Sequence, residues 1–214
     1  QPIRAQVSYL QPVLLPQVMK DNLQINASID RDSDHESLQF GVVVIGRNEG
    51  QRLITCLRSA SKSSIVVYVD SNSTDASVVS ARALGAIVVE LDLSIPFTAG
   101  RARNAGTDRL LKERSDLQYI QFVDGDCELS SEWIKDAVLF LENRPNVAAV
   151  CGRLRERYPD RSVYNWLCDR EWDRPPGKVR SFAGNVLMLV EALKAVGGYR
   201  EEVIAAEEDE LCVR

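Results

Sequence analysis

From residue 40 onward, short runs of β-branched residues alternate with segments whose apolar residues recur every three or four positions. The runs that predict strands are FGVVVIG, IVVYVD, AIVVEL, YIQFVD and VAAVCG, at 40–46, 65–70, 86–91, 119–124 and 147–152. The helical patterns between them lie at 51–61, between Thr74 and Gly85 and from Ser130 or Ser131 to Glu142, and the segment at 98–114 is expected to be a loop that enters a helix. Such alternation indicates parallel strands joined by crossover helices. We therefore predict an α/β domain with a mostly parallel central sheet and helices on both faces.

The last third of the chain is less regular. A polar region that carries tryptophans spans 155–178, and the sequence AGNVLMLV predicts a strand at 183–190. A short helix is expected to end near Gly197 and Gly198, and an acidic run opens a final helix.

Residues 1–39 differ from the rest of the chain. They hold three prolines, few regular apolar repeats and a charged, turn-prone stretch at 30–36. This composition is typical of a linker. We therefore predict an N-terminal arm or linker at 1–39 and one domain at 40–214. An apolar patch at 13–18 could pack on the domain or on a partner.

Composition excludes some classes of function. The chain has 214 residues and a net charge of −5 at pH 7, so it lacks the basic surface that nucleic acid binding needs. No apolar run approaches the ~20 residues that cross a bilayer, and the N-terminus has no leader pattern. The five cysteines form no close pair, which favours reduced thiols. We expect a cytoplasmic protein, either free or at the cytoplasmic face of a membrane.

Polar side chains follow three of the predicted strands. The first strand ends in Arg47-Asn48-Glu49, the second in Asp70, and the fourth in Asp124-Gly125-Asp126. Ligands of open α/β sheets bind beyond the carboxyl ends of the strands. We therefore expect a binding site at this edge of the sheet.

The Asp-Gly-Asp turn is a candidate cation site. Gly125 lets the backbone turn sharply, so that Asp124 and Asp126 can face one hard cation, and Mg²⁺ or Mn²⁺ bridging a diphosphate fits such oxygen ligands. Asp-Gly is also a strong hairpin signal, so the motif alone leaves both interpretations open. Asp70 can accept a hydrogen bond from a nucleobase or a ribose, or cap the following helix.

Two further clusters carry candidate chemistry. Arg101 and Arg103 lie in GRARNAG, where guanidinium groups can bind phosphate oxygens or lie solvated on a helix face. The acidic run at 207–210 suits the positive end of a helix dipole, and its crowding can raise the pKa of one carboxylate toward that of a general base. The same run can also be an ordinary acidic first turn.

In this order, the motifs resemble those of family-two glycosyltransferases, which have the Rossmann-like GT-A fold of nucleotide-sugar transferases. The resemblance covers about residues 40–214 and lies in the ordered set VVVIGRNEG, VDSNSTDAS, RARNAG, FVDGDCEL and AAEEDELCVR. It implies a metal-dependent inverting enzyme, as in polysaccharide biosynthesis. The implied donor is a UDP-, GDP- or dTDP-sugar, and the acceptor is a hydroxyl group.

The resemblance also implies a role for each motif. Asp126 would bind the Mg²⁺ or Mn²⁺ ion directly, with Asp124 assisting or contacting the ribose. Aligned by Glu210 and Leu211, the family's base position falls on Glu208 beside Glu207, whereas a shift of one residue nominates Asp209. The implied donor-binding residues are Gly46, Arg47, Glu49, Asp70, Arg101, Arg103 and Asp124.

The implied reaction is an in-line displacement at the anomeric carbon, in which Glu208 takes the proton of the acceptor hydroxyl and the configuration inverts. Tyr164, Trp166 and Trp172 could stack on a sugar ring or belong to the core. The sequence leaves the acceptor open among glycans, lipid carriers, proteins and small molecules.

Family members commonly continue beyond the final helix with a metal-binding histidine and an acceptor or membrane-associated segment. We therefore expect the domain at 40–214 to be truncated at its C-terminal end, with peripheral membrane association through the part that is not present. His35 lies before the first strand and is a poor substitute for that histidine.

Three alternatives are weighed against this interpretation. A sugar-phosphate nucleotidyltransferase resembles chains with a glycine-rich, arginine-containing phosphate loop, where this chain has GRNEGQR. A dinucleotide-dependent dehydrogenase is weaker still, because GxGxxG is missing from the first turn. A non-catalytic nucleotide-sugar or glycan-binding module that kept the fold is the remaining alternative, and nucleotide binding without turnover would favour it.

Overall fold

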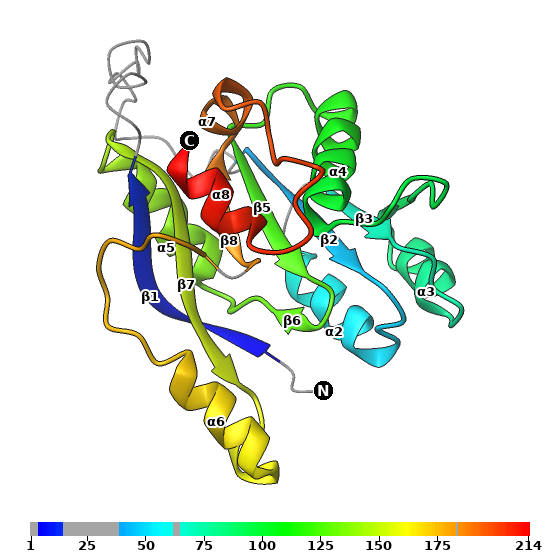
Figure 1. Ribbon diagram of the computed structural model, residues 1–214, viewed down its shortest axis with the longest axis horizontal. Coiled ribbons are helices and arrows are strands. Elements are labelled where there is room, and N and C mark those ends of the chain that lie inside the picture. The colour runs from blue at the N-terminus through cyan, green and yellow to red at the C-terminus, as the bar shows by residue number, and fades with distance from the viewer. Residues whose placement is uncertain (1–3, 15–38, 62–64, 183) are drawn as a thin grey trace.

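The computed structural model describes residues 4–14, 39–61, 65–182 and 184–214. Within them, eight strands form one sheet in the order β4-β3-β2-β5-β8-β7-β1-β6 (Figure 1). The strands are β1 (Arg4–Leu14), β2 (Phe40–Gly46), β3 (Val66–Asp70), β4 (Ile87–Glu90), β5 (Tyr119–Asp124), β6 (Cys127–Glu128), β7 (Val147–Glu156) and β8 (Val186–Leu189). The helices are α2 (Gln51–Ala60), α3 (Ser77–Ala83), α4 (Ala99–Glu113), α5 (Trp133–Glu142), α6 (Val163–Glu171), α7 (Val190–Ala195) and α8 (Glu207–Val213), with a 3-10 helix η1 (Pro159–Arg161).

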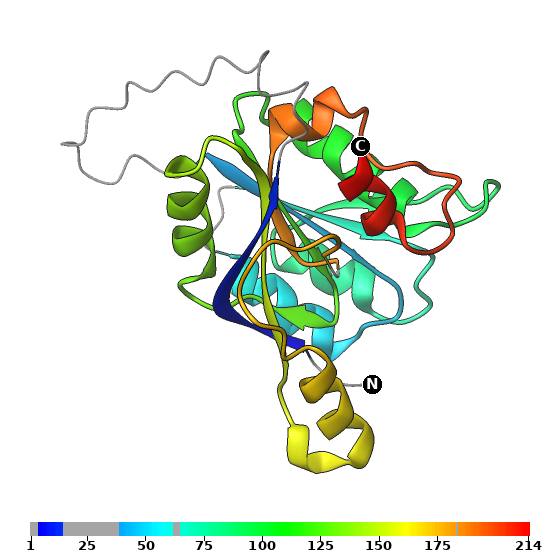
Figure 2. The same cartoon turned by 60° about the vertical axis from the view of Figure 1, so that its left-hand side comes forward.

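The parallel half of the sheet is buried on both faces. Strand β2 pairs in parallel with β3 and β5, and β3 pairs in parallel with β4. Successive residues of β2 join different cores: Val43 packs in a cluster with residues of α4, α7 and α8, and Val44 in a cluster with residues of α2, α3 and α5. The helices therefore lie on the two faces of the sheet, as Figure 2 shows from the side. This confirms the predicted α/β class and Rossmann-like arrangement.

Helix α4 packs unusually close to the sheet. A Cβ atom at Gly106 would lie 2.4 Å from Cγ1 of Val43 and 2.9 Å from Cγ2 of Val69. Real Cβ contacts are longer than this, so a side chain at Gly106 would push the helix away from β2 and β3. The start of α4 is fixed by Thr98, whose hydroxyl accepts a hydrogen bond from the Arg101 amide at 3.1 Å.

The other half of the sheet is mainly antiparallel. Strand β8 pairs antiparallel with both β5 and β7, so β7 runs in the same direction as β5. The carboxyl end of β7 therefore lies at the same edge of the sheet as the carboxyl ends of β2, β3 and β5. Beyond β7 lies β1, which is antiparallel to it.

Strand β1 differs from the expectation of an N-terminal arm or linker at 1–39. Residues 4–14 pair with β7 from Arg4↔Glu156 to Leu14↔Val147 and so belong to the sheet. The register shifts between Val7 and Leu10, and Pro12 lies beyond the two residues that also pair with β6. A bulge and a proline near a sheet edge break the regular alternation that reveals a strand in a sequence. The apolar patch at 13–18 lies mostly, and His35 wholly, outside the described residues.

The polar region at 155–178 also holds more regular structure than its sequence indicates. Strand β7 extends to Glu156, η1 follows it, and α6 occupies 163–171. In Figures 1 and 2, α6 projects from the body of the domain beyond the end of β7. Among the described residues, none of the helices has the length and apolar character that crossing a bilayer requires.

Candidate active site

Asp70 is held rigidly at the carboxyl end of β3. It is buried, and its Oδ1 accepts a hydrogen bond from the Tyr68 hydroxyl at 2.8 Å. Its Oδ2 accepts a hydrogen bond from the Ser73 amide, also at 2.8 Å. Tyr68 thus orients the carboxylate for which the family resemblance implies a contact with the nucleotide. No sequence motif predicts this role of Tyr68.

The loop after β2 is tied to the loop after β3. Asn48 has a left-handed backbone with φ of 55°, and its amide donates to the Ser73 hydroxyl at 2.8 Å. Its side-chain oxygen accepts from the Thr74 amide at 2.7 Å. Gly46 pairs with Asp70 in the sheet, and Arg47 is exposed. The two loops therefore form one unit at the edge of the sheet.

Glu49 lies next to the Asp-Gly-Asp turn. Burial raises the pKa of its carboxyl, and the charges of Asp126 and Asp124 raise it further, although the ion pair with Arg52 at 2.6 Å opposes them. A Cβ atom at Gly125 would lie 3.2 Å from Cγ of Glu49. Gly125 therefore lets the turn approach Glu49, which adds a third carboxylate to this corner.

The turn itself can hold a cation. Ligand atoms of Asp124, Asp126 and Cys127 all lie within 4.8 Å of one another. The Cys127 thiol donates to Oδ1 of Asp126 at 3.5 Å, so it supports this carboxylate. A hard cation such as Mg²⁺ or Mn²⁺ prefers the two carboxylates to a sulfur ligand. The donor set therefore fits the expected metal.

Arg103 links the turn to the final helix. Its side chain is 3% exposed, and its guanidinium contacts Oδ1 of Asp124 at 3.2 Å, Oε1 of Glu207 at 2.6 Å and Oε1 of Glu208 at 3.1 Å. Burial opposes the charge of Arg103, but Tyr199 and the three carboxylates outweigh it and raise its pKa. The guanidinium also lies 5.4 Å from the centre of the Tyr199 ring.

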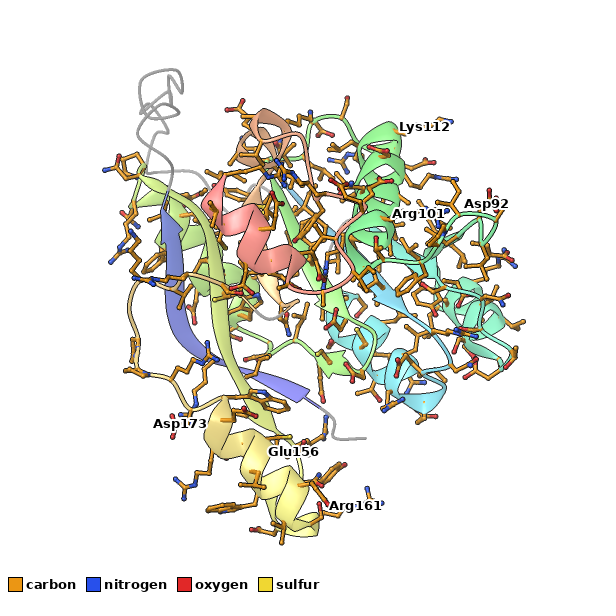
Figure 3. All side chains as sticks on the ribbon, viewed as in Figure 1. Asp92, Arg101, Lys112, Glu156, Arg161 and Asp173 are labelled. Carbon is orange, nitrogen blue, oxygen red and sulfur yellow. The ribbon has the colours of Figure 1, made fainter. Side chains whose placement is uncertain are left out.

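Arg101 is occupied in a different way. Its guanidinium donates to the backbone oxygens of Ile95, at 2.9 Å, and of Asp92, both in the loop after β4. Figure 3 labels Arg101 and Asp92 on α4 and on this loop. Both arginines of the GRARNAG motif are thus engaged within the protein. Burial favours such internal partners for charged groups. The binding of donor phosphates by these two arginines stays a prediction.

The acidic run of α8 separates into distinct environments. Glu207 is buried against Arg103, whereas Asp209 is exposed and Glu210 pairs with Arg214 at 2.7 Å. Burial raises the pKa of Glu208 to about 7, with Arg103 opposing the shift and Glu207 and Asp124 adding to it. Among the acidic residues of α8, Glu208 therefore has a pKa matched to proton transfer near neutrality.

Two features that support this site were missed by the sequence analysis. Gly184 has φ of 63°, and a Cβ atom there would lie 2.5 Å from Oδ2 of Asp124. Asn104 donates to the Tyr199 backbone oxygen at 2.8 Å and accepts from the Tyr199 amide at 2.9 Å. Gly184 leaves room for Asp124, and Asn104 holds the loop that leads to α8. The only sequence signals were an isolated glycine before a strand and the asparagine of RARNAG.

The fold is similar to that of solved glycosyltransferase structures. One is the mannosyltransferase PcManGT from Pyrobaculum calidifontis in complex with GDP-Man and Mn²⁺, at 21% identity and a TM-score of 0.57, over 81% of this chain and 50% of that one. Another is S. aureus TarS, at 19% identity and a TM-score of 0.54, over 81% of this chain and 32% of that one. The present chain thus spans half of the first protein and about a third of the second. These likenesses establish the GT-A fold.

Sequence comparison gives the family. A search of curated proteins finds no match. The family model for glycosyl transferase family 2 matches residues 41–201, which include the loop after β2, the Asp-Gly-Asp turn and the start of the loop that leads to α8. This match covers well over half of the sequence, and the chain therefore belongs to glycosyl transferase family 2.

Proposed function

We propose that this chain carries the donor site and the catalytic base of a metal-dependent, inverting glycosyltransferase. The observation that carries the proposal is the contact of Arg103 with Asp124 on one side and with Glu207 and Glu208 on the other. One buried guanidinium thus joins the candidate metal turn to the candidate base.

In this proposal the donor is a nucleotide diphosphate sugar. Asp70, held by Tyr68 and the Ser73 amide, accepts hydrogen bonds from the base or ribose. Gly46, Arg47 and Glu49 form the adjoining wall. Asp126 and Asp124 hold Mg²⁺ or Mn²⁺, which when bound supplies Lewis-acid stabilisation of the leaving diphosphate. The solved complex of PcManGT with GDP-Man and Mn²⁺ supports a nucleotide diphosphate sugar as the class of donor. It does not identify the nucleotide that this chain binds.

Glu208 acts as the general base. Its carboxylate accepts the proton of the acceptor hydroxyl while the acceptor oxygen forms a bond to the anomeric carbon and the bond from that carbon to the diphosphate oxygen breaks. A single displacement of this kind inverts the configuration. Arg103 and Glu207 position Glu208, and the exposed Asp209 has no such support.

Nucleotide titration tests the proposal. UDP, GDP and dTDP are titrated by calorimetry into the wild-type protein with and without Mn²⁺, and the tightest pair is repeated on Asp126→Asn. The control is Asp108→Asn, an exposed carboxylate on α4 outside the described site. We expect metal-dependent binding of one nucleotide that Asp126→Asn weakens at least about tenfold, or about 1.4 kcal/mol, and Asp108→Asn preserves.

Two other outcomes would contradict parts of the proposal. If Asp126→Asn and Asp108→Asn bind the nucleotide equally well in the presence of Mn²⁺, Asp126 is not a metal ligand. Metal-dependent binding without donor hydrolysis or transfer to any hydroxyl acceptor, in the full-length protein, would instead identify a non-catalytic binding module of the same fold.

A further inference from the structure

The Asp-Gly-Asp turn is followed directly by a cysteine whose thiol lies beside the two carboxylates. Among the described residues, Asp124, Asp126 and Cys127 form a group whose ligand atoms all lie within 4.8 Å of one another. The Cys127 sulfur lies 3.5 Å from Oδ1 of Asp126. The turn therefore presents a sulfur ligand as well as the two carboxylates.

The spacing of these atoms suits a tetrahedral cation. In zinc sites the Zn–S bond is about 2.3 Å and the Zn–O bond about 2.1 Å, so a sulfur and an oxygen on one ion lie roughly 3.6 Å apart at the tetrahedral angle. The distance between the Cys127 sulfur and Oδ1 of Asp126 is 3.5 Å. An ion can therefore replace the thiol proton between these two atoms with almost no change in their spacing.

The sulfur is the deepest of the three ligands. Cys127 is 2% exposed, whereas the side chain of Asp124 is 29% exposed and Asp126 is half-buried. An ion that enters from solvent therefore meets the carboxylates first. Only an ion that binds sulfur gains from the deeper ligand, so Cys127 can discriminate between classes of cation.

The charges around the turn favour a divalent cation. The guanidinium of Arg103 contacts Asp124, but it is shared with two carboxylates of α8. Asp126 has no ion-pair partner in the part of the chain that the structure describes. A cation between Asp126 and Cys127 therefore offsets negative charge that the surrounding side chains leave unbalanced.

We propose that the Asp-Gly-Asp turn also binds Zn²⁺, with Cys127 as the third ligand beside Asp124 and Asp126. Mg²⁺ and Mn²⁺ take oxygen ligands and leave the thiol protonated, whereas Zn²⁺ also takes thiolate sulfur. When the metal–sulfur bond forms, the S–H bond breaks and its proton passes to the buffer. Bound Zn²⁺ occupies the ligands of the proposed donor metal and so blocks Mn²⁺-dependent nucleotide binding. Only this last step rests on the proposed function.

Cobalt spectroscopy tests the sulfur ligand. Co²⁺, which takes the same ligands as Zn²⁺, is titrated into the reduced wild-type protein without nucleotide, and a cobalt–thiolate bond is detected by its near-ultraviolet charge-transfer absorption. We expect a band that Zn²⁺ removes by displacement and that Cys127→Ser and Asp126→Asn both lack. The matched control is Cys168→Ser, which changes a partly buried thiol on α6 and should keep the band.

Calorimetry then measures the selectivity between metals. Cys127→Ser should weaken Zn²⁺ binding at least about tenfold, or about 1.4 kcal/mol, and leave Mn²⁺ affinity unchanged. Zn²⁺ should also inhibit Mn²⁺-dependent nucleotide binding more strongly in the wild type than in this variant. Cys127→Ala repeats the measurements with a side chain that has no ligand atom, and melting temperatures of the metal-free proteins check that both variants fold.

The proposal is overturned if Co²⁺ gives no charge-transfer band with the wild-type protein, if Cys127→Ser keeps the band, or if that variant loses Zn²⁺ and Mn²⁺ affinity equally. Failure of the proposed function is a separate result. A protein that binds Co²⁺ through sulfur but binds no nucleotide with any metal would keep this site and lose the donor site.

Discussion

Neighbouring residues of α8 show how burial gives similar side chains in one run different properties. Glu207, Glu208 and Asp209 are consecutive carboxylates, but one is buried against Arg103, one is partly buried with a pKa of about 7, and one is exposed. The helix rotates successive side chains by about 100°, which places each in a different environment. Composition alone therefore could not show which of the three carboxylates has the raised pKa.

Replacing Glu208 tests this assignment. We expect Glu208→Gln to lower kcat by about 10²- to 10⁴-fold, the usual range for losing a general base, with donor affinity nearly unchanged. The wild-type kcat/KM should rise with pH through about 7, because the base must be ionised, and the variant should lack this rise. Initial rates between pH 5 and 9 measure both effects. Asp209→Asn is the control, and a comparable loss there would move the base to Asp209.

The same variant should be more stable than the wild type above neutral pH. Folding raises the pKa of Glu208 from its ordinary 4.5 to about 7, so the folded state binds this proton more tightly than the unfolded state does. Ionised Glu208 therefore destabilises the fold at pH 8, and the penalty decreases as the pH falls toward 5. Urea unfolding of Glu208→Gln at pH 8 and pH 5 should show a gain that shrinks at the lower pH. A gain independent of pH would contradict the raised pKa.

At the scale of elements, α4 sets the distance between the strand ends of the proposed donor site and the final helix, α8. Gly106 allows α4 to touch β2 and β3, and Arg103 lies almost one turn earlier on the same helix. A larger side chain at 106 would lift the helix and move Arg103 away from its carboxylate partners. The close approach of α4 thus bears on both stability and the site.

We expect Gly106→Val to destabilise the protein by about 1–3 kcal/mol, the usual cost of overpacking, and to weaken activity beyond the loss of folded protein. Equilibrium urea unfolding measures the first effect, and kcat per folded molecule the second. Asp108→Ala is the control, because it changes an exposed position on the same helix. If Gly106→Val unfolds at the wild-type urea concentration, the helix is not held against β2 as the structure shows.

The elements could be predicted where their hydrophobic side faces the core. Strands β2, β3, β4, β5 and β7 and the helices between them follow this rule, and the sequence placed them within a few residues. The two-residue strand β6 was not predicted. Strand β1 escaped because its register shift and Pro12 interrupt the alternation of the sequence. Helix α6 escaped because its apolar residues point outward, so no stripe toward the core marks it.

The strand ends of the candidate site could be predicted from the sequence, but the contacts between their side chains could not. Asp70, Asp124 and Asp126 follow strands, and parallel pairing brings such ends together. The contact between Arg103 and Glu207 joins residues 104 positions apart, and nothing in either motif specifies the other. The sequence does not reveal which charges will be buried, so it could not predict the internal partners of the two arginines.

At the scale of the whole molecule, Arg103 couples distant parts of the chain. Asp124 ends β5 and Glu207 begins α8, and both contact the same guanidinium. Removing one carboxylate leaves Arg103 with other partners, whereas removing both leaves a buried charge with Glu208 alone. The two sides of the site therefore depend on each other energetically.

A double-mutant cycle measures this coupling. We expect Asp124→Asn combined with Glu207→Gln to destabilise the protein by more than the sum of the single changes, with a coupling of about 0.5–3 kcal/mol. Urea unfolding of the four proteins gives the value. Asp124→Asn combined with Asp116→Asn, an exposed partner of Arg114, should be additive within about 0.5 kcal/mol. Additivity in both cycles would show that Arg103 does not couple the two sides.

The pairing of β1 with β7 has a consequence for synthesis of the protein on the ribosome. Val13 pairs with Ala149, which follows it by 136 residues. At about 5–20 residues per second, β1 leaves the ribosome roughly 7–27 s before its partner is made. During that interval it is an unpaired strand that other chains can capture, and Pro12 limits such capture because it cannot donate a backbone hydrogen bond. Strand β1 is therefore synthesised before the other described strands but is among the last to pair.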